Sequence, residues 1–331
     1  MSEAETGSRE VPAGDVRPGP VRPGVSASIH YGKAAVSAYR THGAPLRGLT
    51  AIPESSFTGR DDTLMGAEIE IDERSDACLP AYTSGDNSMV VATDTMKNFI
   101  HAVSLEFAGS TLEGWIEAIG RRFLERYEQM EHVHVAAREI AFKPVQLRAG
   151  EGSSTASDRV FAARRDDHAT AAVVLARRDR AIEVTDLVSG RADLRLVKLS
   201  GSAFAAFARD EYTTLPERTD RALHVFTDVG WRYAEPSIAI APEVSRYVDS
   251  EQVADLVGVV FHEFVSNSIQ HLVHEVGQRM LERWPQLEEV SFEAQNRTWD
   301  LPRVSSTDDQ VRVYTDPPAP YGRIGLVLKR E

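Results

Sequence analysis

Two long segments with apolar residues at three- and four-residue steps constrain the fold most, because this spacing is typical of helices with one buried face. The first lies over about 110–127, and Ser110 with Glu113 is predicted to cap its start as an S-x-x-E box. The second lies over about 250–284 and is interrupted near Ser266-Asn267-Ser268. The apolar residues of the two predicted faces are Leu112, Trp115, Ile116, Ile119, Phe123, Tyr127, Val253, Leu256, Val257, Val260 and Phe264.

Stretches typical of strands flank both predicted helices. A first strand follows Tyr31-Gly32-Lys33, and residues 64–107 are predicted to hold two more, with a turn at Ser84–Asn87 and SMVVATDT in the second. Residues 148–158 are predicted to be a loop or linker. Further strands are predicted from His132 to near Pro144 and at 159–165, 170–188, 194–200, 288–301, 311–315 and 323–330. Runs of strands broken by long helices favour an α+β fold, with helices packed on one face of antiparallel sheets.

The order of the elements suggests two domains behind a polar start. Residues 1–27 are rich in Pro, Gly, Ser and charge, and we expect them to be disordered. Residues 28–150 and 151–331 each read as strands, helix, strands, which predicts two domains of ordinary size. The two halves show no evident sequence repeat, so this division depends on element order alone.

Composition excludes several classes of protein. The net charge of −13 disfavours a general nucleic-acid binder, which would need a basic face. No run of 18 apolar residues occurs, so we expect no membrane span, and the start of the chain does not resemble a signal peptide. Cys78 is the single cysteine, and the ending Lys329-Arg330-Glu331 is not a Ser-Lys-Leu address. We therefore expect a protein of a reducing compartment, the cytoplasm.

The histidines do not predict a metal site. His262-Glu263 lacks the second histidine that an HExxH zinc helix needs. His271 and His274 lie three residues apart without an evident third ligand, and we expect His132 and His134 to be structural. No G-x-G-x-x-G follows a predicted strand, so a dinucleotide cofactor is not expected either.

The stretch from Leu194 to Arg221 carries the most specific signal in the chain. It reads LRLVKLSGSAFAAFARDEYTTLPERTDR. It closely resembles the signature of the urate oxidase (uricase) family through Lys198, Ser200, Ser202, Phe204, Phe207, Tyr212, Leu215 and Arg221. The Tyr31-Gly32-Lys33 run, the segment Tyr82–Asn98 and Ser268-Ile269-Gln270 resemble further family segments in the same order. The resemblance therefore extends from about residue 29 to the end.

Several properties follow from this resemblance. It implies two tandem tunnelling-fold domains and oxidation of urate by O2 to 5-hydroxyisourate and H2O2, with neither metal nor flavin. It also implies a homotetramer whose active sites lie at subunit interfaces.

Five positions match substrate-binding residues of the family. Phe204 can stack on a flat ring, and the planar guanidinium of Arg221 can donate to two adjacent acceptors of the ring. The backbone N–H of Ile269 and the amide of Gln270 can hydrogen-bond another edge. Asp94 matches a ligand contact through its backbone.

The positions of the family's proton-transfer and oxygen-handling residues are held here by Lys33, Thr93, Asn296 and Thr298. Lys33 and Thr93 match the family's base pair, in which a lysine amine and a hydroxyl pass a proton. Asn296 matches the asparagine that holds O2 or water above the ring. In the family, the residues matching Lys33, Thr93 and Asp94 reach into the site of a neighbouring subunit.

Thr298 departs from the family pattern, in which Asn-x-His ends the relay, because this chain reads Asn296-Arg297-Thr298. A threonine hydroxyl hydrogen-bonds but does not titrate near neutral pH. Urate oxidation with altered proton transfer is one interpretation. An oxidase for another purine-like heterocycle in a biosynthetic pathway, or a non-catalytic purine-binding homologue, are the alternatives. A pterin enzyme is disfavoured, because Gln270 stands where such enzymes place a glutamate.

Overall fold

The computed structural model describes residues 21, 24–61, 63–150, 153–163, 167–179, 181–240, 244–297, 299–316 and 320–331. Thr298 and most of the predicted disordered segment 1–27 lie outside these residues. Within them, no helix is long and apolar enough to cross a membrane.

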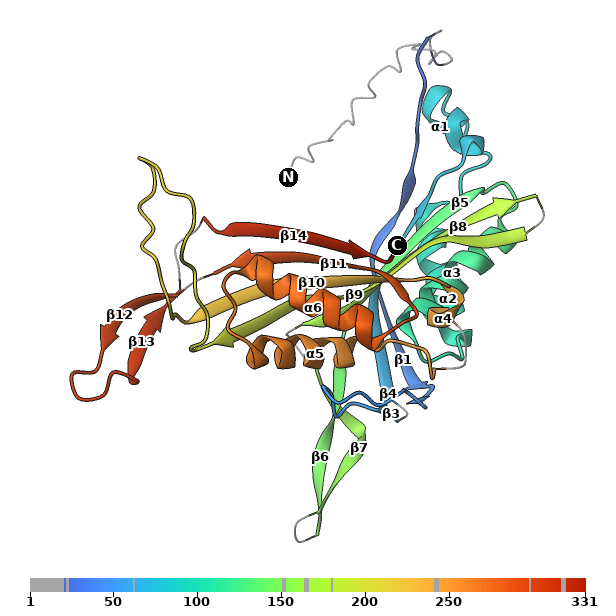
Figure 1. Cartoon of the computed structure of the whole chain (residues 1–331). Coiled ribbons are helices and arrows are strands. Elements are labelled where there is room, and N and C mark those ends of the chain that lie inside the picture. The colour runs from blue at the N-terminus through green and yellow to red at the C-terminus, as the bar shows by residue number, and fades with distance from the viewer. Residues whose placement is uncertain are drawn as a thin grey trace, which may run out of the picture.

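One antiparallel sheet of eight strands forms the body of the molecule (Figure 1). Each strand pairs with its neighbour in the order β1-β4-β5-β8-β9-β10-β11-β14. The bounds of these strands are β1 Tyr31–Gly43, β4 Thr63–Glu73, β5 His132–Glu139, β8 His168–Arg178, β9 Ala181–Lys198, β10 Leu223–Tyr233, β11 Leu287–Asn296 and β14 Gly322–Lys329. Three small ribbons, namely β2 Leu46–Arg47 with β3 Gly59–Arg60, β6 Phe142–Gly150 with β7 Ser153–Ala163, and β12 Asp300–Val304 with β13 Arg312–Thr315, lie outside it.

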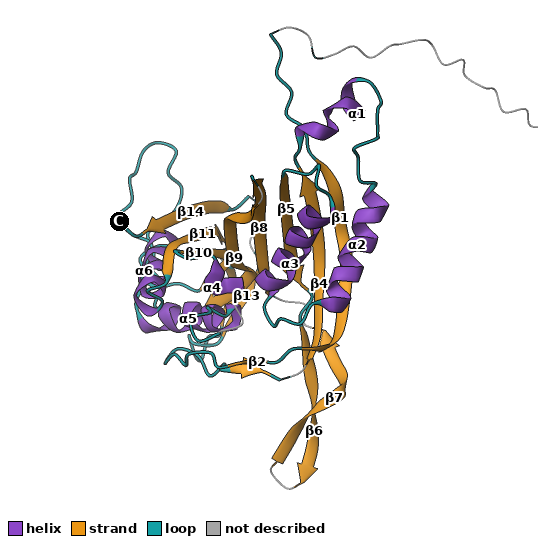
Figure 2. Ribbon diagram, turned by 90° about the vertical axis from the view of Figure 1, so that its right-hand side faces the viewer, coloured by secondary structure: helices purple, strands orange, loops and turns teal. Residues whose placement is uncertain are grey.

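The long helices cover one face of this sheet (Figure 2). Helices α2 (Thr93–Glu106) and α3 (Leu112–Arg126) pack on the first strands, and α5 (Ser250–Glu263) and α6 (Ile269–Arg283) pack on β9, β11 and β14. Burial of their apolar faces joins helices and sheet in one continuous core. Short turns of helix complete the chain at Asp76–Cys78, α1 Leu79–Thr83 and α4 Ser237–Ile240. The predicted α+β class, with helices on one face of an antiparallel sheet, is confirmed.

The second helical region agrees closely with the prediction. The break expected near Ser266–Ser268 separates α5 from α6, and the Ser268 hydroxyl accepts a hydrogen bond from the N–H of His271 at 3.0 Å. A serine at this position satisfies a first-turn N–H that no residue of the helix can reach.

The predicted second strand around residues 88–95 is wrong. Thr93 begins helix α2, and Met96, Ile100 and Val103 bury its inner face. Val90, Val91 and Thr93 favour a strand locally. The helical spacing begins only at Met96, and burial of that face outweighs the local preference.

The predicted cap of α3 is displaced by one residue. Thr111, rather than Ser110, accepts the N–H of Gly114 at 3.1 Å. The Glu113 carboxyl points into the core instead, where Ser189 donates to it at 2.5 Å and Tyr247 at 2.9 Å. Glu113 therefore joins the two halves of the chain and does not cap a helix.

Two further segments differ from the prediction. The expected loop at 148–158 belongs to the β6–β7 hairpin, which extends away from the body of the sheet (Figure 1). Strand β10 was not predicted, although its buried residues alternate with half-buried or exposed ones. Residue 150, the predicted domain boundary, lies at the tip of the hairpin, whereas the strand–strand–helix–helix–strand–strand order begins again at β9.

Candidate functional site

Phe204 and Arg221 lie close together in the loop that joins β9 to β10. The backbones of Phe204 and Arg218 exchange two hydrogen bonds, of 2.8 and 2.9 Å. The N–H of Arg221 donates to the carbonyl of Ser202 at 2.9 Å. These bonds fold the loop back on itself, so that the Arg221 guanidinium carbon lies 5.6 Å from the centre of the Phe204 ring.

Each of these side chains is half-buried and supported by its surroundings. The Phe207 ring stacks on Phe204, with centroids 4.9 Å apart and an angle of 14° between the planes. Burial lowers the pKa of Arg221 from its ordinary value. An arginine remains charged even so, and a partly desolvated guanidinium interacts more strongly with an anion than one in open water.

The start of helix α6 lies beside this loop. Ser202 and Ser266 form a parallel bridge, in which the N–H of Ala203 donates to the Ser266 carbonyl at 2.8 Å. Ile269, three residues further on, is the first residue of α6 and is buried, whereas Gln270 is exposed. The first N–H groups of a helix have no acceptor within it, and they favour an anionic or electron-rich ligand.

Asn296 ends strand β11 near the same end of the sheet. It lies opposite Val225 of β10, and β10 begins two residues after Arg221. Neighbouring elements therefore supply the predicted ring-binding residues and one predicted catalytic residue. The ring-binding residues are Phe204, Arg221, Ile269 and Gln270, and the catalytic residue is Asn296.

The nearby His224 lies on the face of the sheet opposite Asn296. Val225 and Asn296 are directly opposed and point to the same face of the sheet. His224, one residue earlier, points to the other face, where its ring lies 5.1 Å from Trp299. Burial lowers the pKa of His224, and its packing accounts for that shift.

Lys33, Thr93 and Asp94 form a second group at the β1 edge of the sheet. Lys33 lies near the start of β1, and Thr93 and Asp94 begin α2. The Lys97 ammonium donates to the Asp94 carboxylate at 2.5 Å and lowers the pKa of Asp94, and the positive charge of Lys33 lowers it further. Lys33 therefore lies close enough to the start of α2 for its charge to act there.

The structure does not bring the two groups together within one chain. Six strand-to-strand steps separate β1 from β11 in the sheet. At about 4.8 Å a step, this amounts to roughly 29 Å along the sheet. The two groups therefore lie on strands that are far apart in the order of the sheet.

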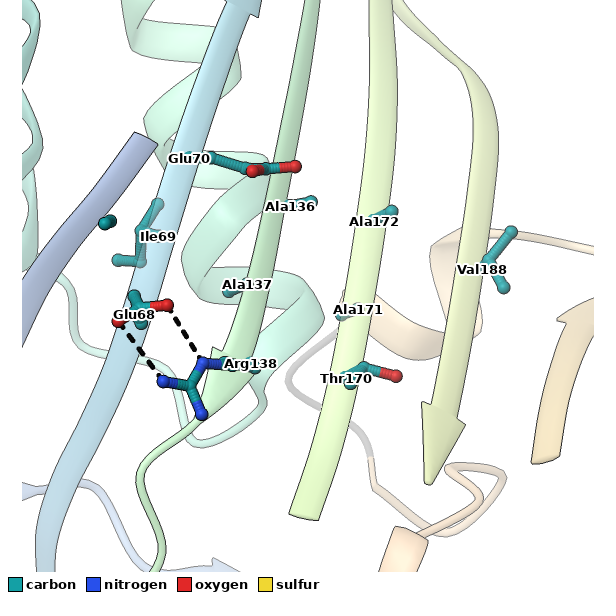
Figure 3. Close-up of a pocket in the computed structure, with 11 residues that line it drawn as sticks. Glu68, Ile69, Glu70, Ala136, Ala137, Arg138, Thr170, Ala171, Ala172 and Val188 are labelled. Carbon is teal, nitrogen blue, oxygen red and sulfur yellow. Dashed lines mark hydrogen bonds and ion pairs between the residues drawn. The ribbon is translucent and has the colours of Figure 1, made fainter. Parts of the chain in front are cut away.

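Two cavities of the single chain lie away from the predicted site residues. One, of about 330 Å³, lies on the face of the sheet opposite the helices, where the ion pair of Glu68 with Arg138 lines it on one side and Val188 on the other (Figure 3). The other, of about 770 Å³, lies at the base of the β6–β7 hairpin. None of the eight predicted site residues that the structure describes lines either cavity.

Among the described residues, Glu70, Asp72 and His134 are a group whose potential metal-ligand atoms all lie within 4.8 Å of one another. His134 Nδ1 is 4.0 Å from the Asp72 carboxylate, and Glu70 is exposed. Nothing else in their surroundings points to a cation.

Sequence reasoning missed the residues that hold the two groups in place. Tyr31, Lys198, Ser202 and Ser266 make hydrogen bonds that fix these segments. Tyr31, Lys198 and Ser202 belong to the motifs that carry the resemblance, so a signal was present. Their roles depend on contacts over long sequence separations.

Comparison with known proteins gives one family. The family model described as Uricase matches residues 54–185 and 187–325. The chain is 45% identical to the uricase of Haloferax volcanii over 295 residues, which cover 89% of this chain and 96% of that protein. It is 42% identical to the bifunctional uric acid degradation protein of Bacillus sp. (strain TB-90), with 89% of this chain and 59% of that longer protein covered.

One solved structure is similar to nearly the whole of this chain. The crystal structure of Bacillus sp. TB-90 urate oxidase superposes with a TM-score of 0.88 at 41% identity. The match covers 92% of this chain and all of that one.

Proposed function

This chain belongs to the uricase family, and we propose on that basis that it oxidises urate with O2. The reaction consumes urate, O2 and water and yields 5-hydroxyisourate and H2O2. The observation that carries the proposal is the placement of Phe204, Arg221 and the start of α6 together at one end of the sheet. This arrangement offers a ring face, a cation and backbone donors to a flat anion.

The ring is held by groups that differ in chemistry. The Arg221 guanidinium donates to two neighbouring acceptors on one edge of urate, and Phe204, supported by Phe207, stacks on its face. The N–H of Ile269 and the amide of Gln270 hydrogen-bond another edge. A heterocycle with a different donor pattern would leave these groups unpaired, which is the basis of selectivity.

Proton transfer is assigned to the second group. Lys33 and Thr93 of a second copy of the chain take a proton from urate, and the backbone of Asp94 contacts the ring. Urate then gives two electrons to O2, which leaves as H2O2, while oxygen from water forms the new C–O bond. Asn296 holds O2 or water above the ring. Because urate itself supplies the electrons, the reaction needs neither metal nor flavin.

The separation of the two groups supports an oligomer. Lys33 and Asn296 lie about six strands apart, so each complete site combines two copies of the chain. We propose the homotetramer that the sequence resemblance implies, with sites at its interfaces. We also propose two tandem tunnelling-fold domains and a cytoplasmic location, the latter because Cys78 is the single thiol.

Thr298 is the reason to keep a second candidate. An oxidase for a related heterocycle would need a ring that matches the same ring-binding residues and a proton transfer that does not use a histidine at position 298. The similar proteins are named for urate, which favours urate over this alternative.

Arg221→Ala tests the proposed function. Loss of a charged, two-point hydrogen-bonding group should raise KM for urate by roughly 100-fold or more. Arg246→Ala is the matched control, because Arg246 forms an exposed ion pair with Glu235 outside the loop that carries Arg221. If Arg221→Ala bound urate as tightly as wild type, the assignment of this pocket to urate would be wrong.

A further inference from the structure

A buried pair of serines joins the two segments that form the proposed ring-binding pocket. One segment is the loop with Phe204 and Arg221, and the other leads into the start of α6. The Ser202 and Ser266 hydroxyl oxygens lie 2.6 Å apart, and neither residue is exposed to solvent. Backbone bonds accompany them: the N–H of Ser266 donates to the Gly201 carbonyl at 3.2 Å, and the N–H of Ala203 donates to the Ser266 carbonyl at 2.8 Å. Residues 64 positions apart in sequence are thereby held in register.

Lys198 makes a second connection between the same segments. It is the last residue of β9, and its ammonium donates to the Phe261 carbonyl at 2.7 Å and to the Phe264 carbonyl at 2.6 Å. Phe261 lies in the last turn of α5. The carbonyls of a last turn have no N–H donor within their own helix. A lysine at this end also faces the negative end of the helix dipole.

Both connections lead directly to the groups that would contact the ligand. The Ser202 carbonyl accepts the N–H of Arg221, and Phe204 follows Ser202 by two residues. On the other side, Ser266 precedes Ile269 by three residues. A shift at either connection therefore changes the distance between the Phe204–Arg221 side of the pocket and the helix N-terminus that faces it.

We propose that Lys198, Ser202 and Ser266 are positioning residues, which set the spacing between the two sides of the ring-binding pocket without touching the ligand. This inference rests on the proposed function, because it concerns the same pocket. A role in stability alone would require only that the segments pack. Burial lowers the pKa of Lys198, so placing its charge there has a cost that an apolar side chain would avoid. The two carbonyls that Lys198 binds account for a cation at this position.

Enzyme kinetics and direct binding separate positioning from stability. KM and kcat for urate, and Kd for urate without oxygen by calorimetry, are measured for Lys198→Met, Lys198→Arg, Ser202→Ala, Ser266→Ala and the double serine variant. Lys198→Met keeps an unbranched side chain and removes the donors. Thr111→Ala is the stability control, because it removes the cap of α3 outside both segments.

We expect Lys198→Met to raise KM and Kd by about 10-fold or more, with a smaller change in kcat, because small displacements in a binding site have large effects. Lys198→Arg should recover most of the loss. Each serine variant should weaken binding, and the double variant should weaken it by less than the product of the two single effects, because both act through one contact. Thr111→Ala should lower Tm without moving KM.

Equal Kd values in wild type, Lys198→Met and both serine variants would overturn the inference, even if their Tm values fell. Wild-type protein that neither binds nor oxidises urate would instead overturn the proposed function, and this inference with it. The two failures therefore give different results in the same experiment.

Discussion

The phenolic oxygen of Tyr31 accepts a hydrogen bond from the backbone N–H of Val91, with 2.9 Å between the two atoms. Lys33 lies two residues after Tyr31 on the same face of β1, and Thr93 lies two residues after Val91. One partly buried contact thus fixes the start of β1 against the start of α2. The proposed base pair is positioned within a single chain before any partner binds.

Substituting Tyr31 by phenylalanine tests this contact. The change removes the acceptor of the Val91 N–H, and loss of such a partner costs about 1–3 kcal/mol. Tm should fall. The decrease in kcat for urate should be larger than the increase in KM, because the substitution does not alter the residues of the proposed ring-binding pocket. Tyr39→Phe, at an exposed position of the same strand, is the control. Identical kcat and Tm in Tyr31→Phe and wild type would show that the contact does not position Thr93.

The proposed two-chain site predicts complementation between inactive variants. Lys33→Met should lower kcat by about 100-fold or more through loss of the base, and Arg221→Ala should lose urate binding. In a mixed dimer of these variants, one site contains both unaltered residues, so random co-assembly should restore about a quarter of the sites. Activity is measured after co-expression of the two variants.

Phe204→Ala mixed with Arg221→Ala is the matched control, because both substitutions lie on the same side of the site. This pair should stay inactive. No recovery in the first mixture, with mixed oligomers verified by mass, would contradict a site that combines Lys33 of one chain with Arg221 of another.

Asp249 predicts a specific dependence of stability on pH. Its carboxyl caps α5 by accepting the N–H of Glu251 at 2.8 Å, and burial raises its pKa from 3.8 to about 7. Between these values the folded protein keeps a proton that the unfolded chain has lost. The contribution of Asp249 to stability is therefore full below about pH 4 and lost as the pH rises to about 7.

Asp249→Asn should remove this dependence, because asparagine caps helices and does not ionise. The Tm of wild type relative to the variant should fall by about 5 °C or more between pH 4 and pH 8. Thermal unfolding of both proteins across this range measures the difference, which cancels the titration of all other groups. A difference that stays constant with pH would contradict the assigned burial of the charge.

Thr298→His tests the departure from the family's Asn-x-His pattern. If the missing imidazole limits proton transfer, the variant should turn over urate faster near neutral pH, where histidine titrates. The pH profile of kcat should also gain an inflection between about pH 6 and 7 that wild type lacks. Unchanged turnover would mean that another group, or water, already completes the transfer.

The sequence predicts elements best where one face is buried regularly. The faces of α3, α5 and α6 follow from their spacing, and Ser268 predicts the break before α6. Helix α2 was not recognised because Val90, Val91 and Thr93 suggest a strand before the helical spacing begins. The β6–β7 hairpin contains Gly, Ser and charged residues that are equally typical of a loop, and only pairing between its strands distinguishes the two.

The residues of the candidate site could be named from motifs, but their arrangement could not. No local pattern shows that Ser202 meets Ser266, or that Tyr31 meets Val91, since each contact spans 60 or more residues. The wide separation of Lys33 from Asn296 depends on the order of the strands in the sheet, which no sequence pattern specifies. Such contacts arise from packing of whole elements, which is not encoded in any one segment.

Oxygen uptake and loss of urate absorbance by the purified wild-type protein test the central claim most directly. No metal or flavin is added, a chelator is present, and the pH is varied from neutral to alkaline. The account predicts that one O2 is consumed, and one H2O2 formed, for each urate lost. Tight binding of urate without consumption of O2 at any pH would contradict it, and would show that this pocket holds urate without oxidising it.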